Sequence, residues 1–321
     1  MTQAKERTQA QYEAPTPKYL WHSGEIIPWE EATVHITQIG WTAISAVFEG
    51  IRGYWSQEQG QTYLFRLDEH LKRLASSMKL MRMEPRFSSE EVTQAIVQLI
   101  RASDYKEDVY IQPLAYFSGS IPGYHPAANR PSELLITARP AQSNLGTERG
   151  SHCCVSSWVR ISDNAMPPRV KALANYQNNR LVSTEARING YDSGIILNDG
   201  GKVAEGAYSC IFLVKDGAAV TPDVTSGILE GITRASVMKL LREDMGLEVR
   251  EREVDRTELY VADEIFLCGT LAEIEPVLSV DRYTIGEGAS GPVTSRLERL
   301  YHTIVRGQHE GHSRLWCTPV Y

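Results

Sequence analysis

The spacing of apolar residues predicts helices and strands in turn along the first half of the chain. Apolar residues recur every three or four positions over 68–81 and 88–102, which is the spacing of one buried helix face. Asp68 is a plausible N-cap for the first helix, and Ser88 or Ser89 begins the second. Short apolar runs between turn residues predict strands at 19–27 (two, about a Ser-Gly turn), 44–54, 63–66, 109–117 and 134–138.

The second half repeats this alternation. A helix is predicted over 179–189 and ends at Gly190, a second opens at 229–234 and stops near Gly246, and a third starts at Pro292. The turn Asn198-Asp-Gly-Gly201 between two apolar runs is a strong hairpin signal. The predicted strands are 194–197, 203–206, 209–214, 218–220 and 264–268. The alternation of strands and helices predicts the fold class α/β (α+β). Because no glycine-rich phosphate loop joins a strand to a helix, a dinucleotide-binding domain has no support.

A polar segment bounded by glycine, 141–150, is the best candidate for a linker between two domains. A chain of 321 residues is long enough for two domains with a large core. We therefore expect a flexible tail at 1–17, a smaller α/β domain at 18–140 and a larger domain at 151–321.

Composition narrows the class of partners. The net charge of −7 argues against nucleic acid or an anionic membrane as the main partner. No apolar run approaches membrane-spanning length, and residues 1–17 lack the apolar core of a secretory signal. The five cysteines show no CxxC or Cys/His spacing, so we expect reduced thiols in a cytoplasmic protein and no metal site.

The segment 166–176, Met-Pro-Pro-Arg-Val-Lys-Ala-Leu-Ala-Asn-Tyr, contains the candidate nucleophile. Two prolines fix the backbone before Lys171, which then lies among small and apolar residues. Poor solvation disfavours the charged form of a lysine amine and makes it a better nucleophile, as a Schiff-base lysine requires. This stretch alone is also compatible with a surface lysine whose stem covers a leucine, and by itself it favours that interpretation.

Together with its neighbours, however, the segment resembles the fold-type IV pyridoxal 5'-phosphate (PLP) aminotransferases, and most closely the branched-chain amino-acid aminotransferases. The matching motifs are Lys171-Ala-Leu-Ala-Asn-Tyr176, Glu185-Ala-Arg187, Gly190-Tyr191 and Glu205-Gly206, and the resemblance runs from about Trp21 to about Gly307. It implies a two-domain fold like that of D-amino-acid aminotransferase, with PLP between the domains and 151–321 as the PLP-binding domain. It also implies a homodimer or a larger homo-oligomer, in which the loop at 118–126 reaches the partner's site.

The resemblance implies a set of cofactor contacts. Lys171 would hold PLP covalently and act as general base and acid, Tyr176 would hydrogen-bond the ring oxygen, and Glu205 would bind the pyridine nitrogen. The remaining implied contacts, mostly with the phosphate, are Arg73 of the pattern His70-Leu-Lys-Arg73-Leu74, Leu229, the amides of Ile232 and Thr233, and Thr270. From the residues alone, Arg73 is also compatible with a solvated helix arginine and Glu205 with an exposed turn glutamate.

The implied substrate contacts are Phe48, Arg52, Tyr110, Gln112, Thr270 and Leu271. One of them departs from the family, which shows Tyr-x-Arg-Pro where this chain has Tyr110-Ile-Gln112-Pro113. Glutamine donates hydrogen bonds but carries no charge, so a charge-assisted contact becomes a weaker one. Ala43 also falls where the family often has tyrosine. The site is therefore expected to tolerate donors without a carboxylate, unless Arg52 or Arg130 supplies the charge.

The implied activity is a ping-pong transfer of the amino group of L-leucine, L-isoleucine or L-valine to 2-oxoglutarate, with side activity on (R)-configured primary amines. An (R)-selective amine transaminase, a D-amino-acid aminotransferase and an aminodeoxychorismate lyase share this fold and remain alternatives. The lyase would release pyruvate without a keto-acid co-substrate. A PLP-binding protein without turnover, or a dimeric scaffold without cofactor, is a further alternative, and absorbance of a bound cofactor would separate these two.

Overall fold

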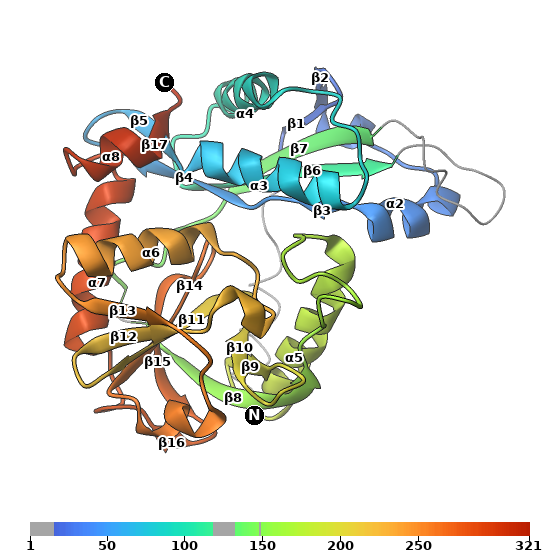
Figure 1. The fold of residues 1–321 in the computed structure, drawn as a ribbon. Coiled ribbons are helices and arrows are strands. Elements are labelled where there is room, and N and C mark those ends of the chain that lie inside the picture. The colour runs from blue at the N-terminus through green and yellow to red at the C-terminus, as the bar shows by residue number, and fades with distance from the viewer. Residues whose placement is uncertain (1–15, 118–131, 148) are drawn as a thin grey trace, which may run out of the picture. The chain divides into compact units, whose positions relative to one another are not determined.

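The computed structural model describes residues 16–117, 132–147 and 149–321, and the chain forms two compact units (Figure 1). Unit 1 comprises Met1–Ser143 and Val305–Tyr321, and unit 2 comprises Asn144–Ile304. The boundary falls inside the linker predicted at 141–150. The C-terminal segment, which the sequence placed with the second domain, returns to unit 1 because β17 (Cys317–Pro319) pairs with β5 (Gln61–Phe65). Most of the expected tail at 1–17 and the whole loop at 118–126 lie outside the described residues.

The described strands of unit 1 form one antiparallel sheet in the order β17-β5-β4-β6-β7-β1-β2, with β3 beside β6. Every strand predicted in the first half is present, and the pair about Ser23 and Gly24 is the hairpin β1–β2. Besides β5 and β17, the strands are β1 (Tyr19–His22), β2 (Glu25–Pro28), β3 (Val47–Phe48), β4 (Ile51–Ser56), β6 (Val109–Phe117) and β7 (Ser132–Pro140).

Two amphipathic helices of unit 1 match their predicted ranges. Helix α4 (Ser89–Ser103) begins with a capping box between Ser88 and Glu91, as its sequence suggests. Helix α3 (Leu67–Leu80) does not begin at Asp68, which lies in its first turn; Arg66 is the N-cap. The reason is tertiary, because the Arg66 amide donates to the Trp316 carbonyl at 2.6 Å and its guanidinium lies over the Trp316 ring. The shorter helices are α2 (Ile39–Ser45), α8 (His312–Trp316), η1 (Trp29–Glu31) and η2 (Ile36–Gln38).

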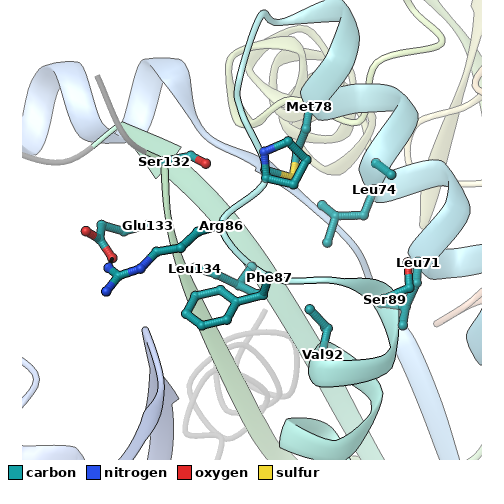
Figure 2. Close-up of a pocket in the computed structure, with 12 residues that line it drawn as sticks. Leu71, Leu74, Met78, Arg86, Phe87, Ser89, Val92, Ser132, Glu133 and Leu134 are labelled. Carbon is teal, nitrogen blue, oxygen red and sulfur yellow. Dashed lines mark hydrogen bonds and ion pairs between the residues drawn. The ribbon is translucent and has the colours of Figure 1, made fainter. Parts of the chain in front are cut away.

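The two faces of this sheet differ in their environment. Residues of β6 and β7 alternate between buried and half-buried positions, as a strand period of two requires. Buried Leu134 of β7 lies beside the apolar residues of α3 and α4, around a small apolar pocket (Figure 2). Helices α3 and α4 therefore pack on the face that carries Leu134. The opposite face carries the half-buried side chains of Tyr110, Gln112 and Arg139.

Unit 2 contains a second sheet, in the order β10-β9-β8-β15-β14-β11-β12-β13, with β16 beside β15. Strand β8 runs parallel to β9 and β15, and β12 parallel to β13; the other pairings are antiparallel. The predicted hairpin at 198–201 joins β9 to β10. The strands are β8 (Ser151–Val159), β9 (Ser193–Leu197), β10 (Val203–Gly206), β11 (Cys210–Lys215), β12 (Ala218–Thr221), β13 (Glu248–Glu251), β14 (Glu264–Gly269), β15 (Glu273–Val280) and β16 (Tyr283–Thr284).

Three longer helices accompany this sheet: α5 (Tyr176–Ile188), α6 (Ile232–Glu243) and α7 (Pro292–Val305). The sequence predicts all three, but α5 begins three residues before the predicted 179, and α6 begins inside the predicted opening at 229–234. Gly190 follows α5 at a φ of 76°, a conformation that glycine adopts without steric cost. The apolar core lies between strands and contains residues such as Val203, Ile211 and Leu267. Three short 3-10 helices complete the unit: η3 (Leu173–Asn175), η4 (Val224–Ser226) and η5 (Arg256–Val261).

Candidate active site

Lys171 lies in a turn that backbone and side-chain hydrogen bonds fix. The amide of Val170 donates to the carbonyl of Pro167 at 3.1 Å, and the buried Val170 side chain anchors the turn. Asn175, also buried, donates from Nδ2 to the carbonyls of Pro167 and Val170, each at 3.0 Å. The sequence pattern assigns Asn175 no role beyond its place in the segment that contains Lys171. Its contacts show that it holds the segment from which the Lys171 side chain projects.

The structure brings Lys171 and Tyr176 into contact, as expected of two residues at one cofactor. Lys171 Nζ donates to the Tyr176 hydroxyl at 2.6 Å and lies 5.2 Å from the centre of its ring. The Tyr176 ring stacks on Tyr208, with 6.0 Å between centroids. The half-buried amine of Lys171 is therefore held beside the phenol of Tyr176, which is the first residue of α5.

Glu205 is a buried carboxylate with two fixed partners. Its Oε2 accepts from the Leu229 amide at 2.9 Å, and its Oε1 pairs with the Arg160 guanidinium at 2.9 Å. Burial raises the pKa of Glu205, and the charge of Arg160, the Leu229 amide and the charge of Lys171 oppose that rise.

Arg160, which the sequence analysis did not single out, is the central support of Glu205. It follows β8 directly and is buried, and besides Glu205 it donates from Nε to the Gly227 carbonyl at 2.9 Å and from a terminal nitrogen to Asn179 Oδ1 at 3.2 Å. Asn179 in turn donates to the Ala207 carbonyl. No local pattern indicates this role, because all the partners of Arg160 come from other segments of unit 2.

The start of α6 has the features of an anion site. Its N-cap, Gly231, has no side chain to accept from the first amides, and a Cβ there would lie 2.6 Å from Cys210 Sγ. Ile232 and Thr233, which provide those amides, are buried. Unpaired amides and the dipole of a twelve-residue helix favour a phosphate at this end. The arrangement fits the phosphate of PLP.

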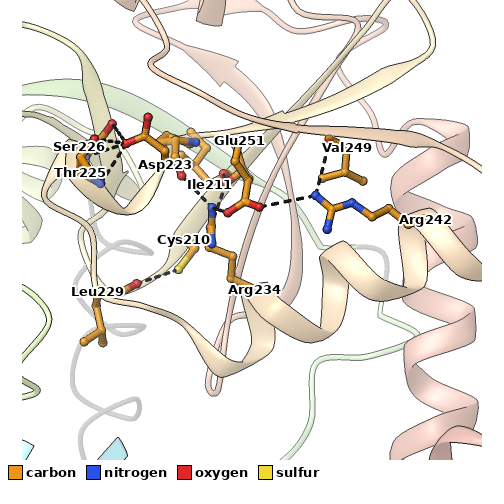
Figure 3. A network of polar contacts seen from close by, with 12 residues as sticks. Cys210, Ile211, Asp223, Thr225, Ser226, Leu229, Arg234, Arg242, Val249 and Glu251 are labelled. Carbon is orange, nitrogen blue, oxygen red and sulfur yellow. Dashed lines mark hydrogen bonds and ion pairs between the residues drawn. The ribbon is translucent and has the colours of Figure 1, made fainter. Parts of the chain in front are cut away.

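The loop between β12 and α6, residues 222–231, is anchored along its length (Figure 3). Asp223 Oδ1 accepts hydrogen bonds from the amides of Thr225 and Ser226. The Thr225 hydroxyl, first, and these amides lower the pKa of Asp223. Buried Arg234 donates to the Pro222 carbonyl at 2.9 Å, and Cys210 Sγ to the Leu229 carbonyl at 3.7 Å. The amide that binds Glu205 and the cap of α6 are thus held by one preorganised loop.

Thr270 and Leu271 follow β14 at the other predicted phosphate and substrate contact. Thr270 is half-buried and Leu271 is exposed. A Cβ built on Gly269 would lie 3.5 Å from the Tyr208 carbonyl. This turn therefore lies next to the tyrosine that stacks on Tyr176, close to the lysine.

Arg73, predicted to bind phosphate, lies in unit 1 beside Glu49. Its guanidinium makes a two-point contact with that carboxylate at 2.6 and 2.9 Å, and His70 Nδ1 lies 2.7 Å from the same group. Although burial opposes ionisation, the charges of Arg73 and His70 hold the pKa of Glu49 far below its usual range. The phosphate contact of Arg73 stays a prediction, and His70 is a buried partner of Glu49, as expected of a structural histidine.

The predicted substrate residues of unit 1 lie on or beside β4 and β6. Phe48 is buried, and Tyr110 and Gln112 share one face of β6. The terminal nitrogens of Arg52 donate to the carbonyls of Ala141 and Gln142 at 2.7 and 3.1 Å, which anchors the end of unit 1. Substrate contacts by these four residues stay predictions, and Arg130 lies outside the described residues.

In the described parts of the chain, no three His, Cys, Asp or Glu side chains gather as a metal would require. Nor is any described helix long and apolar enough to cross a bilayer. All five cysteines are buried free thiols.

Comparison with known proteins places these features in a family. The family model for class IV aminotransferases matches residues 46–280. A probable branched-chain-amino-acid aminotransferase of Aquifex aeolicus is 41% identical over 94% of this chain and 97% of its own, and the branched-chain-amino-acid aminotransferase of Escherichia coli K12 is 40% identical over 91% and 94%. The crystal structure of the Thermobaculum terrenum branched-chain amino acid aminotransferase in its PLP form superimposes with a TM-score of 0.92, at 53% identity over 95% and 99%.

Proposed function

Because the chain belongs to the class IV aminotransferases, which use PLP, we propose that it transfers the amino group of branched-chain L-amino acids to 2-oxoglutarate by a ping-pong mechanism. The observation that carries this proposal is the contact of Lys171 Nζ with the Tyr176 hydroxyl at 2.6 Å, in a unit that also contains the buried carboxylate of Glu205. The substrate class follows the names of relatives at 40% identity and above.

The residues of unit 2 divide the work of the reaction. PLP, when bound, supplies an electron sink for the electrons released at the donor α-carbon. Lys171 Nζ would hold the cofactor. Once the donor amine has taken its place, the freed Lys171 amine would remove the proton from the donor α-carbon as general base and later give that proton up as general acid. The Tyr176 hydroxyl positions that nitrogen, at 2.6 Å. Glu205, whose charge Arg160 and the Leu229 amide favour, is suited to pair with a protonated ring nitrogen.

The phosphate of the cofactor would be held by the start of α6. The amides of Ile232 and Thr233 would donate to it, because the N-cap Gly231 has no side chain that could accept from them instead. Thr270 would donate from the turn after β14. Arg73 would add a charge-assisted contact, which requires it to share its guanidinium with Glu49.

A side activity toward (R)-configured primary amines follows from Gln112. Where the family carries an arginine, this strand offers an uncharged amide, so a donor without a carboxylate loses less there than in its relatives. The same substitution weakens one source of preference for amino acids.

Initial rates with a panel of donors test this function. With 2-oxoglutarate as acceptor, L-leucine, L-isoleucine and L-valine are expected to react fastest, (R)-1-phenylethylamine measurably but more slowly, and D-leucine not at all. Varying both substrates should give parallel double-reciprocal lines, the kinetic pattern of a ping-pong mechanism. Preferential turnover of D-leucine, or pyruvate release without an acceptor, would instead indicate one of the other activities found on this fold.

The protein is further proposed to act in the cytoplasm as a homodimer or larger homo-oligomer. Buried free thiols, as all five cysteines are, are typical of a reducing compartment.

A further inference from the structure

Arg139 lies on the same face of the unit 1 sheet as the two residues of β6 that are proposed to contact substrate. In the register of β6 and β7, Tyr110 pairs with Arg139 and Gln112 pairs with Thr137. Directly paired residues point to the same face, and diagonal neighbours lie within reach of long side chains. Arg139 is therefore the diagonal neighbour of Gln112, on the face opposite the one that α3 and α4 cover.

The guanidinium of Arg139 is oriented but carries no counter-charge. It lies over the Tyr110 ring, 5.2 Å from the centroid, and is half-buried. Across the described residues, this stacking is the contact that Arg139 makes, and no carboxylate pairs with it. Tyr110 is itself fixed, because its hydroxyl packs on Gly50, where a Cβ would lie 2.4 Å away. The five N–H donors of a guanidinium lie in its plane, so an aromatic ring stacked on one face leaves them able to donate to an acceptor.

Other cations near this face are engaged elsewhere. Arg52, paired with Tyr110 from the other side, donates to the carbonyls of Ala141 and Gln142. Arg86 lines the pocket on the other face, beside α3 and α4, and pairs with Glu133 at 2.8 Å. Among the described arginines of this face, Arg139 is thus placed to receive an anion.

We propose that Arg139 binds the carboxylate of the amino-acid donor and of the keto-acid acceptor, supplying from β7 the charge that Gln112 does not supply from β6. The proposal rests on the proposed function, since both substrates of an amino-acid transaminase carry a carboxylate. A planar guanidinium binds a carboxylate through two parallel hydrogen bonds, which explains why the charge can move to a neighbouring strand and remain useful. Arg139 is then a specificity-determining residue that favours amino acids over plain amines.

Arg139→Gln is expected to lower kcat/KM for L-leucine by about 10- to 100-fold, the effect of losing a charge-assisted contact, while kcat/KM for (R)-1-phenylethylamine stays within about twofold. A second readout needs no turnover. Binding of 4-methylvaleric acid, which has the carbon skeleton of leucine without its amine, should weaken by a similar factor when measured by calorimetry on the PLP-loaded enzyme. If Arg139 had a merely structural role, the substitution would lower kcat/KM for both donors together.

The double variant Gln112→Arg with Arg139→Gln moves the guanidinium back to β6 and should recover most of the activity with leucine. Arg86→Gln, which removes an arginine from the same unit, is the matched control and should leave kcat/KM unchanged for both donors. Equal losses for leucine and the amine, or no loss of 4-methylvaleric acid binding, would overturn the proposal while wild-type turnover of leucine still stood. Failure of the wild-type enzyme with leucine would instead refute the proposed function.

Discussion

Lys171→Ala is expected to lower kcat for L-leucine by about 10⁴-fold or more, because it removes both the group that holds the cofactor and the general base. The loss should exceed that at any other residue of the site, since Tyr176 and Glu205 act by positioning and charge, whereas Lys171 Nζ moves the proton. Steady-state rates with 2-oxoglutarate as acceptor measure the change.

A second readout tests whether Lys171 is the residue that carries the cofactor. Borohydride reduction of the wild-type enzyme should attach the cofactor covalently to the peptide that contains Lys171, and mass spectrometry of the variant should show no attachment. Lys215→Ala is a matched control, because Lys215 is an exposed lysine of the same unit that pairs with Asp263. Near-normal turnover by Lys171→Ala would exclude Lys171 as the catalytic residue.

Arg160→Gln is expected to destabilise the cofactor-free protein by about 3 kcal/mol at neutral pH, because it leaves the buried carboxylate of Glu205 without its charged partner. It should also lower kcat by about 10- to 100-fold, since a less firmly charged Glu205 pairs less well with a ring nitrogen. The midpoint of urea unfolding and the initial rate with L-leucine measure the two effects.

The pH dependence gives this prediction a specific signature. Burial already raises the pKa of Glu205, and loss of the Arg160 charge should raise it further. A carboxyl whose pKa is higher in the folded than in the unfolded state binds more protons when folded, so stability falls as pH rises through the folded value. The deficit of the variant should therefore shrink as pH is lowered, where a protonated Glu205 needs no cation.

An exposed ion pair provides the control for Arg160. Arg250 pairs with Glu248 at 2.7 Å, but both side chains are exposed, so Arg250→Gln should leave the unfolding midpoint essentially unchanged. A deficit in Arg160→Gln that is the same at every pH would mean that the loss is one of packing rather than of charge.

The sequence predicts the elements of this fold well wherever local signals are strong. The helix start at Ser88 and the Asn-Asp-Gly-Gly turn at 198–201 are local features, and both are found where expected. The N-cap of α3 is Arg66, two residues before the predicted Asp68, because the helix start depends on a contact between Arg66 and Trp316 that is remote in sequence. The pairing of β17 with β5 is not predicted from the sequence for the same reason, since the two strands are remote in sequence.

The site shows the same division. Lys171, Tyr176 and Glu205 lie in motifs that can be read from the chain; the structure places all three in unit 2 and brings Lys171 into contact with Tyr176. Their supports cannot be read that way. Arg160 reaches Gly227 and Glu205 from the end of a strand, and Arg139 is related to Gln112 by strand register alone.

The most direct test of the central claim, that Lys171 and its neighbours hold PLP for amino transfer from branched-chain amino acids, is a half-reaction followed by absorbance. Purified enzyme loaded with cofactor is mixed with L-leucine without an acceptor, and separately with (R)-1-phenylethylamine. Leucine should bleach the band of the lysine-bound cofactor rapidly and the amine slowly, and 2-oxoglutarate should restore the band. A band that leucine leaves unchanged, or that the amine bleaches faster, would contradict the claim.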